Sequence, residues 1–353
     1  MKPGKSPIKV CMLTSVHCCT DVRIYHKQAR TLAQNGYSVA IIAPDSIPED
    51  ELGINFIPFS RPEGKIKRIL FSSRRIFKIA LEQNADIYHL HDPELLIAGL
   101  KLKKRGKTVI FDSHEDIEKQ ILNKYWIKPF LRKLTAFLFD KLCRYCTRRF
   151  DLVIAATESI EERYKRYGCK TGTVKNYPII KEFDIINTIW EDRRNSFCYI
   201  GGIMKIRGIA QMLDALSYTS ADMELAGRFD NSALENITKS HPNWARVTYH
   251  GFVGRIGVAD ILARVKIGAV ILHPVPNYID SLPIKMFEYM AAGIPVIASD
   301  FPLFRQILHD NACGICVDPF NAEEIGNTID KLLHDDDLAR TMGENGKRAV
   351  KEK

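Results

Sequence analysis

The chain has 353 residues, of which 46% are hydrophobic and 26% are charged, and its formal net charge is +9. This length exceeds what one hydrophobic core usually supports, so two domains are expected, and the composition is ordinary for a soluble globular protein. No run approaches the roughly 18 apolar residues of a membrane span, and the N-terminus lacks an apolar signal core. We therefore expect neither a spanning helix nor secretion.

Apolar strands alternate with helical segments through the first half of the chain. The strands are expected at residues 9–14, 38–43, 87–91, 108–112, 151–155 and 172–175. The helices are expected at residues 23–35, 67–83 and 94–105, the first of them ended by Gly36. This alternation predicts a parallel sheet with crossover helices on both faces.

A second series of strands follows a stretch of mixed charge that contains an X-Pro step. Residues 179–195 are interpreted as a linker between an N-terminal acceptor-side domain, 1–178, and a C-terminal domain, 196–353. The later strands are expected at residues 197–200, 223–226, 247–250, 268–272, 295–299 and 314–317. The fold class is therefore α/β, with two Rossmann-like domains facing a cleft where the carboxyl ends of the strands converge.

The most informative segment runs from Asp280 to Ser299. Asp280 and Glu288 stand eight residues apart, and a helix expected at residues 285–292 is followed by Gly293 and an apolar strand. A loop that opens a helix presents free backbone N–H groups and the positive end of the helix dipole, which suits a phosphate. Glu288 could accept hydrogen bonds from sugar hydroxyls, so the segment predicts a cradle for a nucleotide sugar.

This segment resembles the donor-binding motif of retaining glycosyltransferases of the GT-B fold, family 4 (group 1 glycosyltransferases), in which two Glu stand where Asp280 and Glu288 stand here. The resemblance implies that Glu288 holds the donor ribose, that Asp280 contacts the transferred sugar, and that the backbone between them holds the diphosphate. It further implies transfer with retention and without a metal or other cofactor. The donor-binding residues of this segment are then Ser281, Leu282, Pro283, Lys285 and Glu288.

A glycine-rich turn supplies the other expected phosphate contacts. Gly201 and Gly202 follow a strand and precede a helix, and Lys205 and Arg207 could neutralise a diphosphate. The family normally has Arg where Gly202 stands and Lys where Arg207 stands, so Lys205 or Lys285 is expected to supply the missing charge. By the same resemblance, Arg207 stabilises the leaving diphosphate, Gly227 begins a loop near the base, and residues 250–253 read the base edge.

The loop after the first strand carries His17, Asp21 and Arg23. A loop at this place faces the expected cleft and offers polar groups to an acceptor, as in related transferases. That family loop is usually glycine-rich, but here it has no glycine. Asp21 also has the position of an N-cap for the helix that follows, which explains it structurally without a role in binding.

Histidines end two further strands of the first half. His89 and His91 lie two residues apart on a strand, so a metal is conceivable. Structure is favoured over metal, because Asp92 and Pro93 have the pattern of an N-cap followed by proline at the first helical position. His91 is then expected at the lip of the cleft. His114 occupies the place where the family keeps a histidine that contacts the donor sugar.

The positive charge is concentrated between Lys124 and Arg149. That segment has eight basic residues and one acidic residue, Asp140, interleaved with many aliphatic and aromatic side chains. It could lie on an anionic membrane, or it could be a pair of core helices with a solvated face. Nucleic acid is not expected as a partner, because the basicity is local and no nucleic-acid-binding motif is present.

Nine cysteines without a signal peptide indicate a reducing cytosol rather than a disulfide scaffold. Cys143-x-x-Cys146 and Cys313-x-x-Cys316 have the spacing of half zinc sites, but their helical and apolar positions are typical of buried thiols. No metal is expected. Because the family usually continues past the position of Arg348 into a helix that returns to the first domain, we expect either a truncated C-terminus or weaker domain docking.

The expected function is transfer of a sugar from a nucleotide-diphosphate donor to a glycan or lipid-linked acceptor, in cell-surface polysaccharide synthesis such as that of lipopolysaccharide or capsule. The expected location is the cytoplasm, peripheral at the inner face of the plasma membrane. Two alternatives are a sugar-nucleotide epimerase of the same fold and a catalytically silent scaffold. The base, the sugar, the acceptor and the oligomeric state are not determined by the sequence.

Overall fold

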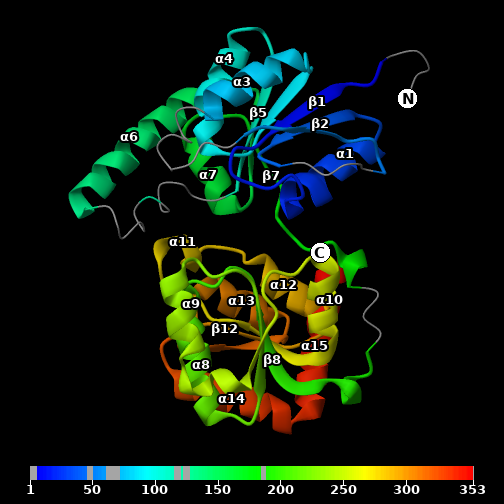
Figure 1. Ribbon diagram of the computed structural model, residues 1–353, viewed down its shortest axis with the longest axis vertical. Coiled ribbons are helices and arrows are strands. Elements are labelled where there is room, and N and C mark those ends of the chain that lie inside the picture. Colours follow the sequence, from blue (N-terminus) through cyan, green and yellow to red (C-terminus); the bar gives the residue numbers. More distant parts are fainter. Residues whose placement is uncertain are drawn as a thin grey trace. The chain divides into compact units, whose positions relative to one another are not determined.

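The computed structural model describes residues 6–45, 51–60, 72–114, 121, 128–183 and 188–352. The chain divides into two compact units, Met1–Asn176 and Tyr177–Lys353, and each is built on a parallel sheet (Figure 1). The interpreted linker, residues 179–195, belongs to the second of these units. Among the described residues, no helix combines the length and the apolar character needed to cross a bilayer.

The first unit contains a seven-stranded sheet in the order β3-β2-β1-β4-β5-β6-β7, with every pair of neighbours parallel. The strands are β1 (Lys9–Leu13), β2 (Ser38–Ala43), β3 (Asn55–Pro58), β4 (Ile87–Leu90), β5 (Thr108–Ser113), β6 (Leu152–Ala155) and β7 (Thr171–Thr173). The helices are the π-helical η1 (Val22–Ala29), α1 (Arg30–Gln34), α3 (Ser73–Glu82), η3 (Pro93–Leu95), α4 (Leu96–Lys103), α6 (Pro129–Thr147) and α7 (Glu158–Arg166).

The second unit contains a six-stranded parallel sheet in the order β10-β9-β8-β11-β12-β13. The strands are β8 (Arg194–Ile200), β9 (Asp222–Ala226), β10 (Val247–Tyr249), β11 (Val265–Val270), β12 (Val296–Ser299) and β13 (Gly314–Val317). The helices are η4 (Ile180–Glu182), η5 (Trp190–Asp192), η6 (Lys205–Arg207), α8 (Ile209–Ala215), η7 (Leu216–Tyr218), α9 (Ser232–Lys239), η8 (Pro242–Arg246), α10 (Arg255–Arg264), α11 (Pro276–Ile279), α12 (Ile284–Ala291), α13 (Pro302–Asp310), α14 (Ala322–His334) and α15 (Asp336–Glu352).

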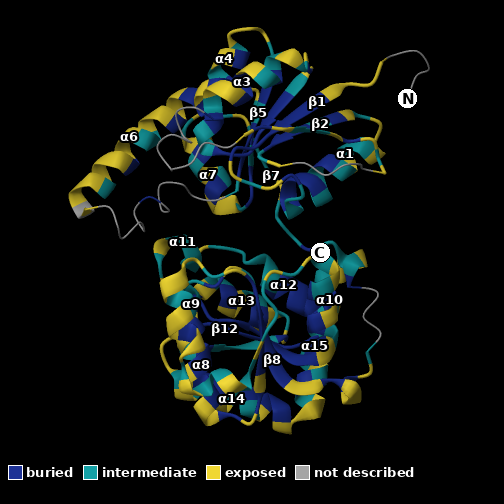
Figure 2. Ribbon diagram, in the orientation of Figure 1, coloured by how far each residue is buried: buried dark blue, intermediate teal, exposed yellow. Residues whose placement is uncertain are grey.

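Most expected elements are present, with boundaries shifted by a few residues. The strands expected at 38–43 and 314–317 are confirmed at those bounds, whereas β3 was not predicted. Residues 67–71 of one expected helix lie outside the described residues, and α3 covers part of the remainder. The central strands are largely buried, the edge strands β3, β7, β10 and β13 are only partly buried, and the helices that cover the sheets have exposed outer sides (Figure 2).

Strand order fixes where ligands are expected in each unit. In the first sheet the direction of winding reverses between β1 and β4, and in the second it reverses between β8 and β11. Loops that leave the carboxyl ends of such strands diverge to opposite faces, which opens a crevice at that point. The loops that follow β1, β4, β5 and β8 carry most of the residues singled out from the sequence.

Candidate functional site

A buried carboxylate organises the first of two polar constellations. Asp112, at the end of β5, is fully buried and accepts hydrogen bonds from Arg23 Nε (2.9 Å), Arg23 Nη2 (2.7 Å) and Gln28 Nε2 (2.6 Å). Burial by itself would raise the pKa of Asp112, but the charge and hydrogen bonds of His114, His91 and Arg23 hold that pKa well below its usual value. Asp112 is therefore an anion inside the first unit.

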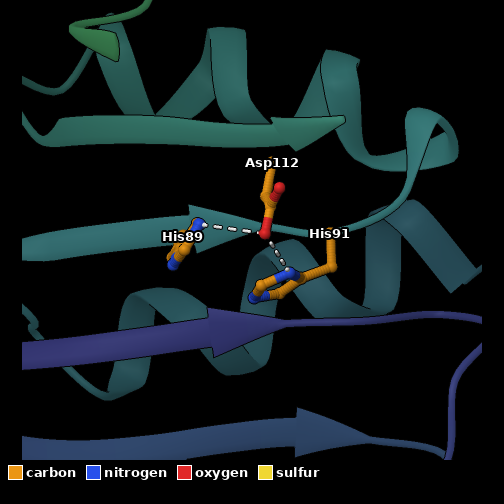
Figure 3. A group of neighbouring side chains, drawn as sticks. All are labelled: His89, His91 and Asp112. Carbon is orange, nitrogen blue, oxygen red and sulfur yellow. Dashed lines mark ion pairs between the residues drawn. The ribbon is translucent and has the colours of Figure 1, made fainter. Parts of the chain in front are cut away.

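Three imidazoles surround this carboxylate. Its Oδ2 lies 4.0 Å from His89 Nε2, 3.6 Å from His91 Nδ1 and 3.4 Å from His114 Nε2, and Figure 3 shows the first two. Burial lowers the pKa of His91 and lowers that of His89 further, so both rings are neutral near pH 7. His91 Nδ1 also lies 3.2 Å from His114 Nε2, and His114 is the most exposed of the three.

The distances within this cluster would suit a metal ion, since His89, His91 and Asp112 offer ligand atoms within 4.8 Å of one another. The hydrogen bonds argue against one. Arg23 and Gln28 already occupy Asp112 Oδ2, and a guanidinium at 2.9 Å repels a second cation at the same oxygen. The cluster fits a buried ion pair lined by neutral imidazoles.

Asp92 is the N-cap residue of η3 and Pro93 is its first helical residue, as expected. The Asp92 side chain makes no capping hydrogen bond to that helix; it accepts from Thr14 Oγ1 (2.8 Å) and Ser15 N (2.5 Å) and so fixes the loop after β1. Two expectations about this unit require correction. His91 was expected at the lip of a cleft, but it is only 3% exposed. Arg23 was expected on the acceptor side, but its side chain is buried against Asp112.

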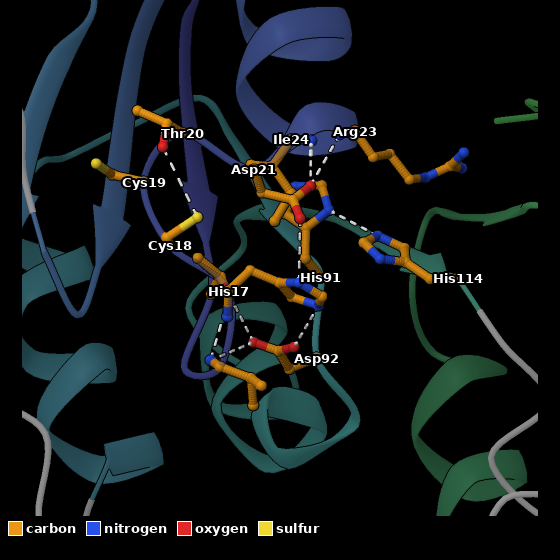
Figure 4. A network of polar contacts seen from close by, with 12 residues as sticks. His17, Cys18, Cys19, Thr20, Asp21, Arg23, Ile24, His91, Asp92 and His114 are labelled. Carbon is orange, nitrogen blue, oxygen red and sulfur yellow. Dashed lines mark hydrogen bonds and ion pairs between the residues drawn. The ribbon is translucent and has the colours of Figure 1, made fainter. Parts of the chain in front are cut away.

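His17 and Asp21 do lie at the surface of this loop. Asp21 accepts from Arg23 N (2.8 Å) and Ile24 N (3.0 Å), which confirms the expected N-cap. His17 lies between Asp21 and Asp92, with nitrogen–oxygen distances of 3.3 and 3.4 Å (Figure 4). The solvent-facing groups here are thus His17, Asp21 and His114, whose ring centroid lies 5.3 Å from that of His17.

The second constellation begins with three glycines at the ends of neighbouring strands. Gly201, Gly227 and Gly251 follow β8, β9 and β10, and all three have positive φ. Gly201 N donates to Ala226 O (2.9 Å), and Gly227 N donates to Gly251 O (2.7 Å). A β-carbon on Gly227 would lie 1.9 Å from Gly201 O, so only glycine fits. Because glycine has no side chain, these three strand ends present a surface of backbone atoms alone at the glycine positions.

Two cations lie beside this surface. Arg207 donates from Nε to Tyr278 Oη (3.1 Å) and from Nη1 to Gly202 O (3.3 Å). The Lys285 amine reaches the same loop from α12: a β-carbon on Gly201 would lie 2.8 Å from Nζ. Lys205 is exposed on η6. The structure therefore brings Lys285 next to the position where the family's missing Arg would stand.

The Lys285 amine is buried and has no hydrogen-bond partner among the described residues. It lies 3.7 Å from the centre of the Tyr199 ring. Burial, together with the charge of Arg207, lowers the pKa of this amine well below its usual value. An anion that enters the loop would stabilise the protonated, positively charged form of Lys285.

Glu288 is buried on α12 and is bound by a residue that the sequence did not reveal. Arg255 Nη1 donates to Glu288 Oε1 (2.7 Å), and the other guanidinium nitrogens donate to Glu182 Oε2 (2.9 and 2.6 Å). Arg255 opens α10 without any surrounding motif, so no local signal could have identified it. Glu288 is fixed in orientation by this ion pair.

The turn that precedes α12 contains the remaining expected donor residues. Asp280 is exposed at the end of α11, and Ser281 Oγ donates to Tyr278 O (2.9 Å). Leu282 and Pro283 complete the turn, and Pro283 is the N-cap residue. The expected helix is therefore present one residue earlier than predicted. Its first backbone N–H groups lack intrahelical partners, as at any helix start.

The loop after β10 presents backbone and aromatic groups. Tyr249 Oη donates to Gly227 O (3.0 Å), and His250 Nε2 lies 2.5 Å from the buried Glu224 carboxylate. Phe252 is 68% exposed, and the Arg228 guanidinium lies 4.4 Å from the centre of its ring. The His250 side chain is thus engaged internally, and His250 N and Gly251 O are bonded within the sheet end, whereas Phe252 is exposed.

Two family models match the chain. Residues 181–349 match glycosyl transferases group 1, and residues 22–175 match glycosyltransferase family 4. The phosphatidyl-myo-inositol mannosyltransferase of Mycobacterium leprae is 21% identical over 343 residues, which cover 92% of this chain and 86% of that protein.

Solved structures agree in fold. Sucrose-phosphate synthase from Thermosynechococcus elongatus superposes with a TM-score of 0.73 at 17% identity, covering 98% of this chain and 94% of that one. HepE of Anabaena in complex with UDP-glucose has a TM-score of 0.70 at 15% identity, covering 98% and 95%. At these identities the superpositions show the fold, which consists of two parallel-sheet domains.

Proposed function

This chain belongs to the group 1, family 4 glycosyltransferases, with the GT-B fold, and from that premise we propose that it moves a sugar from a nucleotide-diphosphate donor, held by the second unit, to a glycan or lipid-linked acceptor. The observation that carries the donor site is the glycine surface at the ends of β8, β9 and β10, flanked by two cations and a buried carboxylate. A flat backbone surface accommodates a nucleotide, and the flanking charges suit a diphosphate and a ribose.

In the proposed complex, the diphosphate lies on Gly201 and Gly202 beside Arg207 and Lys285. The backbone N–H groups near Leu282, at the start of α12, provide further donors. Glu288 accepts from the ribose hydroxyls through the lone pairs that Arg255 does not use. The base lies near Gly227 and the backbone of residues 250–253, with Phe252 exposed beside it.

We propose that transfer proceeds with retention and without a metal ion. As the bond to the sugar breaks, charge develops on the leaving diphosphate, and preorganised cations at that position lower the barrier. Arg207 and Lys285 are suited to this, since both are held beside the glycine loop before the donor arrives. Asp280 and His114 are proposed to contact the transferred sugar, His114 through an imidazole that both donates and accepts.

We propose a lipid-linked or glycan acceptor of cell-surface polysaccharide synthesis and a place at the inner face of the plasma membrane. One support is that the Mycobacterium leprae relative carries a membrane lipid, phosphatidyl-myo-inositol, in its name. The other is the basic and apolar segment from Lys124 to Arg149, of which residues 124–127 lie outside the described part of the chain. His17 and Asp21 are the proposed acceptor-side groups that remain at the surface.

The first test is thermal stabilisation by UDP, GDP, ADP, dTDP and their sugars. A ligand that binds only the folded state raises the midpoint temperature of unfolding. At a ligand concentration one hundred times Kd, the added free energy of unfolding is about 2.7 kcal/mol. One nucleotide is expected to shift the wild type and the Glu235→Ala control, and not Glu288→Ala. If no nucleotide shifts the midpoint of the wild type, the proposed donor site is contradicted and a scaffold function is favoured.

A second measurement separates the transferase from an epimerase of the same fold. The selected nucleotide sugar is incubated with the enzyme alone, and the sugar is analysed by NMR. An epimerase converts the donor without any acceptor, whereas a transferase leaves it intact apart from slow hydrolysis. Release of nucleotide only after addition of a membrane lipid extract would support the proposed acceptor class.

A further inference from the structure

The helix α6 (Pro129–Thr147) has an inverted distribution of apolar side chains. Small residues face the body of the first unit: Ala136, Cys143, Cys146 and Thr147 are all at most 2% exposed. Phe139 also packs against that core, but the other large apolar residues of the helix face outward. Because a helix of a soluble protein normally buries its large apolar side chains, this distribution requires an explanation.

The exposed apolar side chains form one continuous stripe. Of the 17 large hydrophobic side chains that are exposed among the described residues, seven lie on this helix. They recur at helical spacing: Phe130, Leu131, Leu134, Phe137, Leu138, Leu142 and Tyr145. Phe130 is 77% exposed, Phe137 56% and Leu138 57%, and Figure 2 shows the outer side of α6 as exposed. At the helical rise of about 1.5 Å per residue, the stripe extends over about 22 Å of this 19-residue helix.

Exposed cations accompany the stripe, and its single carboxylate is neutralised. The cations on and next to α6 are Lys128, Lys133, Lys141, Arg144, Arg148 and Arg149. Asp140 is paired with Arg163 at 2.6 Å. The Lys141 and Arg149 side chains lie over the rings of Phe137 and Tyr145, at 5.2 and 3.7 Å from the ring centroids. Cations stacked beside exposed apolar groups are typical of a protein face that contacts a partner with an apolar layer and an anionic layer.

We infer that this face of α6 docks on an anionic lipid bilayer, with its large apolar side chains in the acyl boundary and its cations at the headgroup phosphates. A helix parallel to the bilayer plane buries its apolar stripe by several ångströms, and each nearby cation adds attraction to anionic lipid. A second copy of the chain is a poorer occupant, because two faces with this excess of positive charge repel each other.

The inference deepens the proposed function, on which it rests for its biological purpose: it gives the lipid-linked acceptor a surface on which to meet the enzyme. Lipid binding itself requires no nucleotide. The two proposals can therefore fail separately. If the wild type binds nucleotide but not vesicles, the docking face alone is overturned. If it binds vesicles but no nucleotide, the donor site alone is overturned.

The test is co-sedimentation of the full chain with vesicles of phosphatidylcholine mixed with phosphatidylglycerol, compared with phosphatidylcholine alone. The wild type is expected to bind the anionic vesicles, and more weakly as salt is added. The triple variant Phe130→Ser, Phe137→Ser, Leu138→Ser is expected to lower the affinity by about tenfold or more. The triple variant Lys133→Glu, Lys141→Glu, Arg144→Glu is expected to lower it by roughly a hundredfold.

Matched controls carry the same changes at exposed positions elsewhere. Ile237→Ser with Ile256→Ser removes exposed apolar groups from the second unit, and Arg74→Glu with Lys78→Glu reverses exposed charges on α3. Both controls are expected to bind vesicles like the wild type. Equal loss in the controls, or no binding by the wild type, would overturn the inference.

Insertion of the stripe has its own readout. Phe137→Trp places an indole in the middle of the outer face, and its fluorescence emission is expected to shift to shorter wavelength when anionic vesicles are added. Ile256→Trp is the control, with no expected shift. An unchanged emission of Phe137→Trp in the vesicle-bound protein would overturn insertion. Self-association that is lost in the serine variant while vesicle binding persists would assign the face to a second copy instead.

Discussion

Replacing Lys285 by methionine removes a buried amine while keeping a side chain of similar length. The amine has no hydrogen-bond partner among the described residues, and its pKa is well below its usual value. The groups that face it are Arg207, Glu288, Cys198 and Tyr199, of which Arg207 opposes the charge and Glu288 favours it. Between the depressed pKa of the folded state and the pKa of the unfolded state, folding of the wild type therefore releases a proton from Lys285. The variant has no such proton release.

The sign and size of the effect follow from proton linkage. In the unfolded chain Lys285 titrates near pH 10.4, so between its depressed folded pKa and that value the unfolded state binds one more proton. The free energy of unfolding of the wild type therefore rises with pH relative to the variant, by about 1.4 kcal/mol per pH unit. Over that interval the stability advantage of the methionine variant should shrink steadily as the pH is raised.

The assay is urea unfolding of the wild type and the Lys285→Met variant at several pH values, followed by a probe in the second unit. Lys205→Met, which removes an exposed lysine from η6, is the control and should give a pH profile parallel to that of the wild type. Calorimetry of nucleotide diphosphate binding in buffers of different ionisation enthalpy should also show more proton uptake by the wild type than by Lys285→Met. Parallel pH profiles for the wild type and Lys285→Met would refute a lowered pKa of this buried amine.

Three further predictions concern stability. Arg23→Met leaves the Asp112 carboxylate buried without its guanidinium and should cost about 3–5 kcal/mol by urea unfolding; a cost below about 1 kcal/mol would mean that the imidazoles alone hold the charge. Gly227→Ala should lower the free energy of unfolding by about 2–4 kcal/mol, because φ is +147° and the new carbon would lie 1.9 Å from Gly201 O. Gly254→Ala is the control: a β-carbon there has open space, so this variant should be nearly neutral in the same assay. Asp21→Ala removes an N-cap and should lower the thermal midpoint by an amount equivalent to about 1 kcal/mol; an unchanged midpoint would mean that the η1 start needs no cap.

Local pattern accounts for the elements that were predicted well. Strands such as β2 and β12 are nearly continuous apolar runs because parallel strands are covered on both faces. The strand β3 was missed because it lies at the edge of its sheet, includes Asn55 and Pro58, and is only partly buried. The edge position relaxes the apolar pattern that reveals a central strand.

Local pattern located some residues correctly without revealing their partners. Asp92 and Pro93 have the sequence of a helix start, and η3 does begin there, yet the Asp92 carboxylate bonds the loop after β1, 77 residues earlier in the chain. Asp92 Oδ2 accepts from Thr14 Oγ1, Ser15 N and Val16 N, and the side chain makes no capping bond to the helix. Arg23 likewise lies in a segment that the sequence places in a loop, but its side chain forms an ion pair with the buried Asp112.

The sequence by itself determined the two parallel sheets, the position of the glycine turn, and the segment from Asp280 to Ser299, because each depends on residues close together in the chain. The tertiary structure alone decided which charges meet: Arg255 with Glu288, and Lys285 with the loop of Gly201. It also decided that α6 turns its large apolar side chains outward. Composition records which side chains a segment contains, but only the packing of its neighbours determines which of them reach solvent.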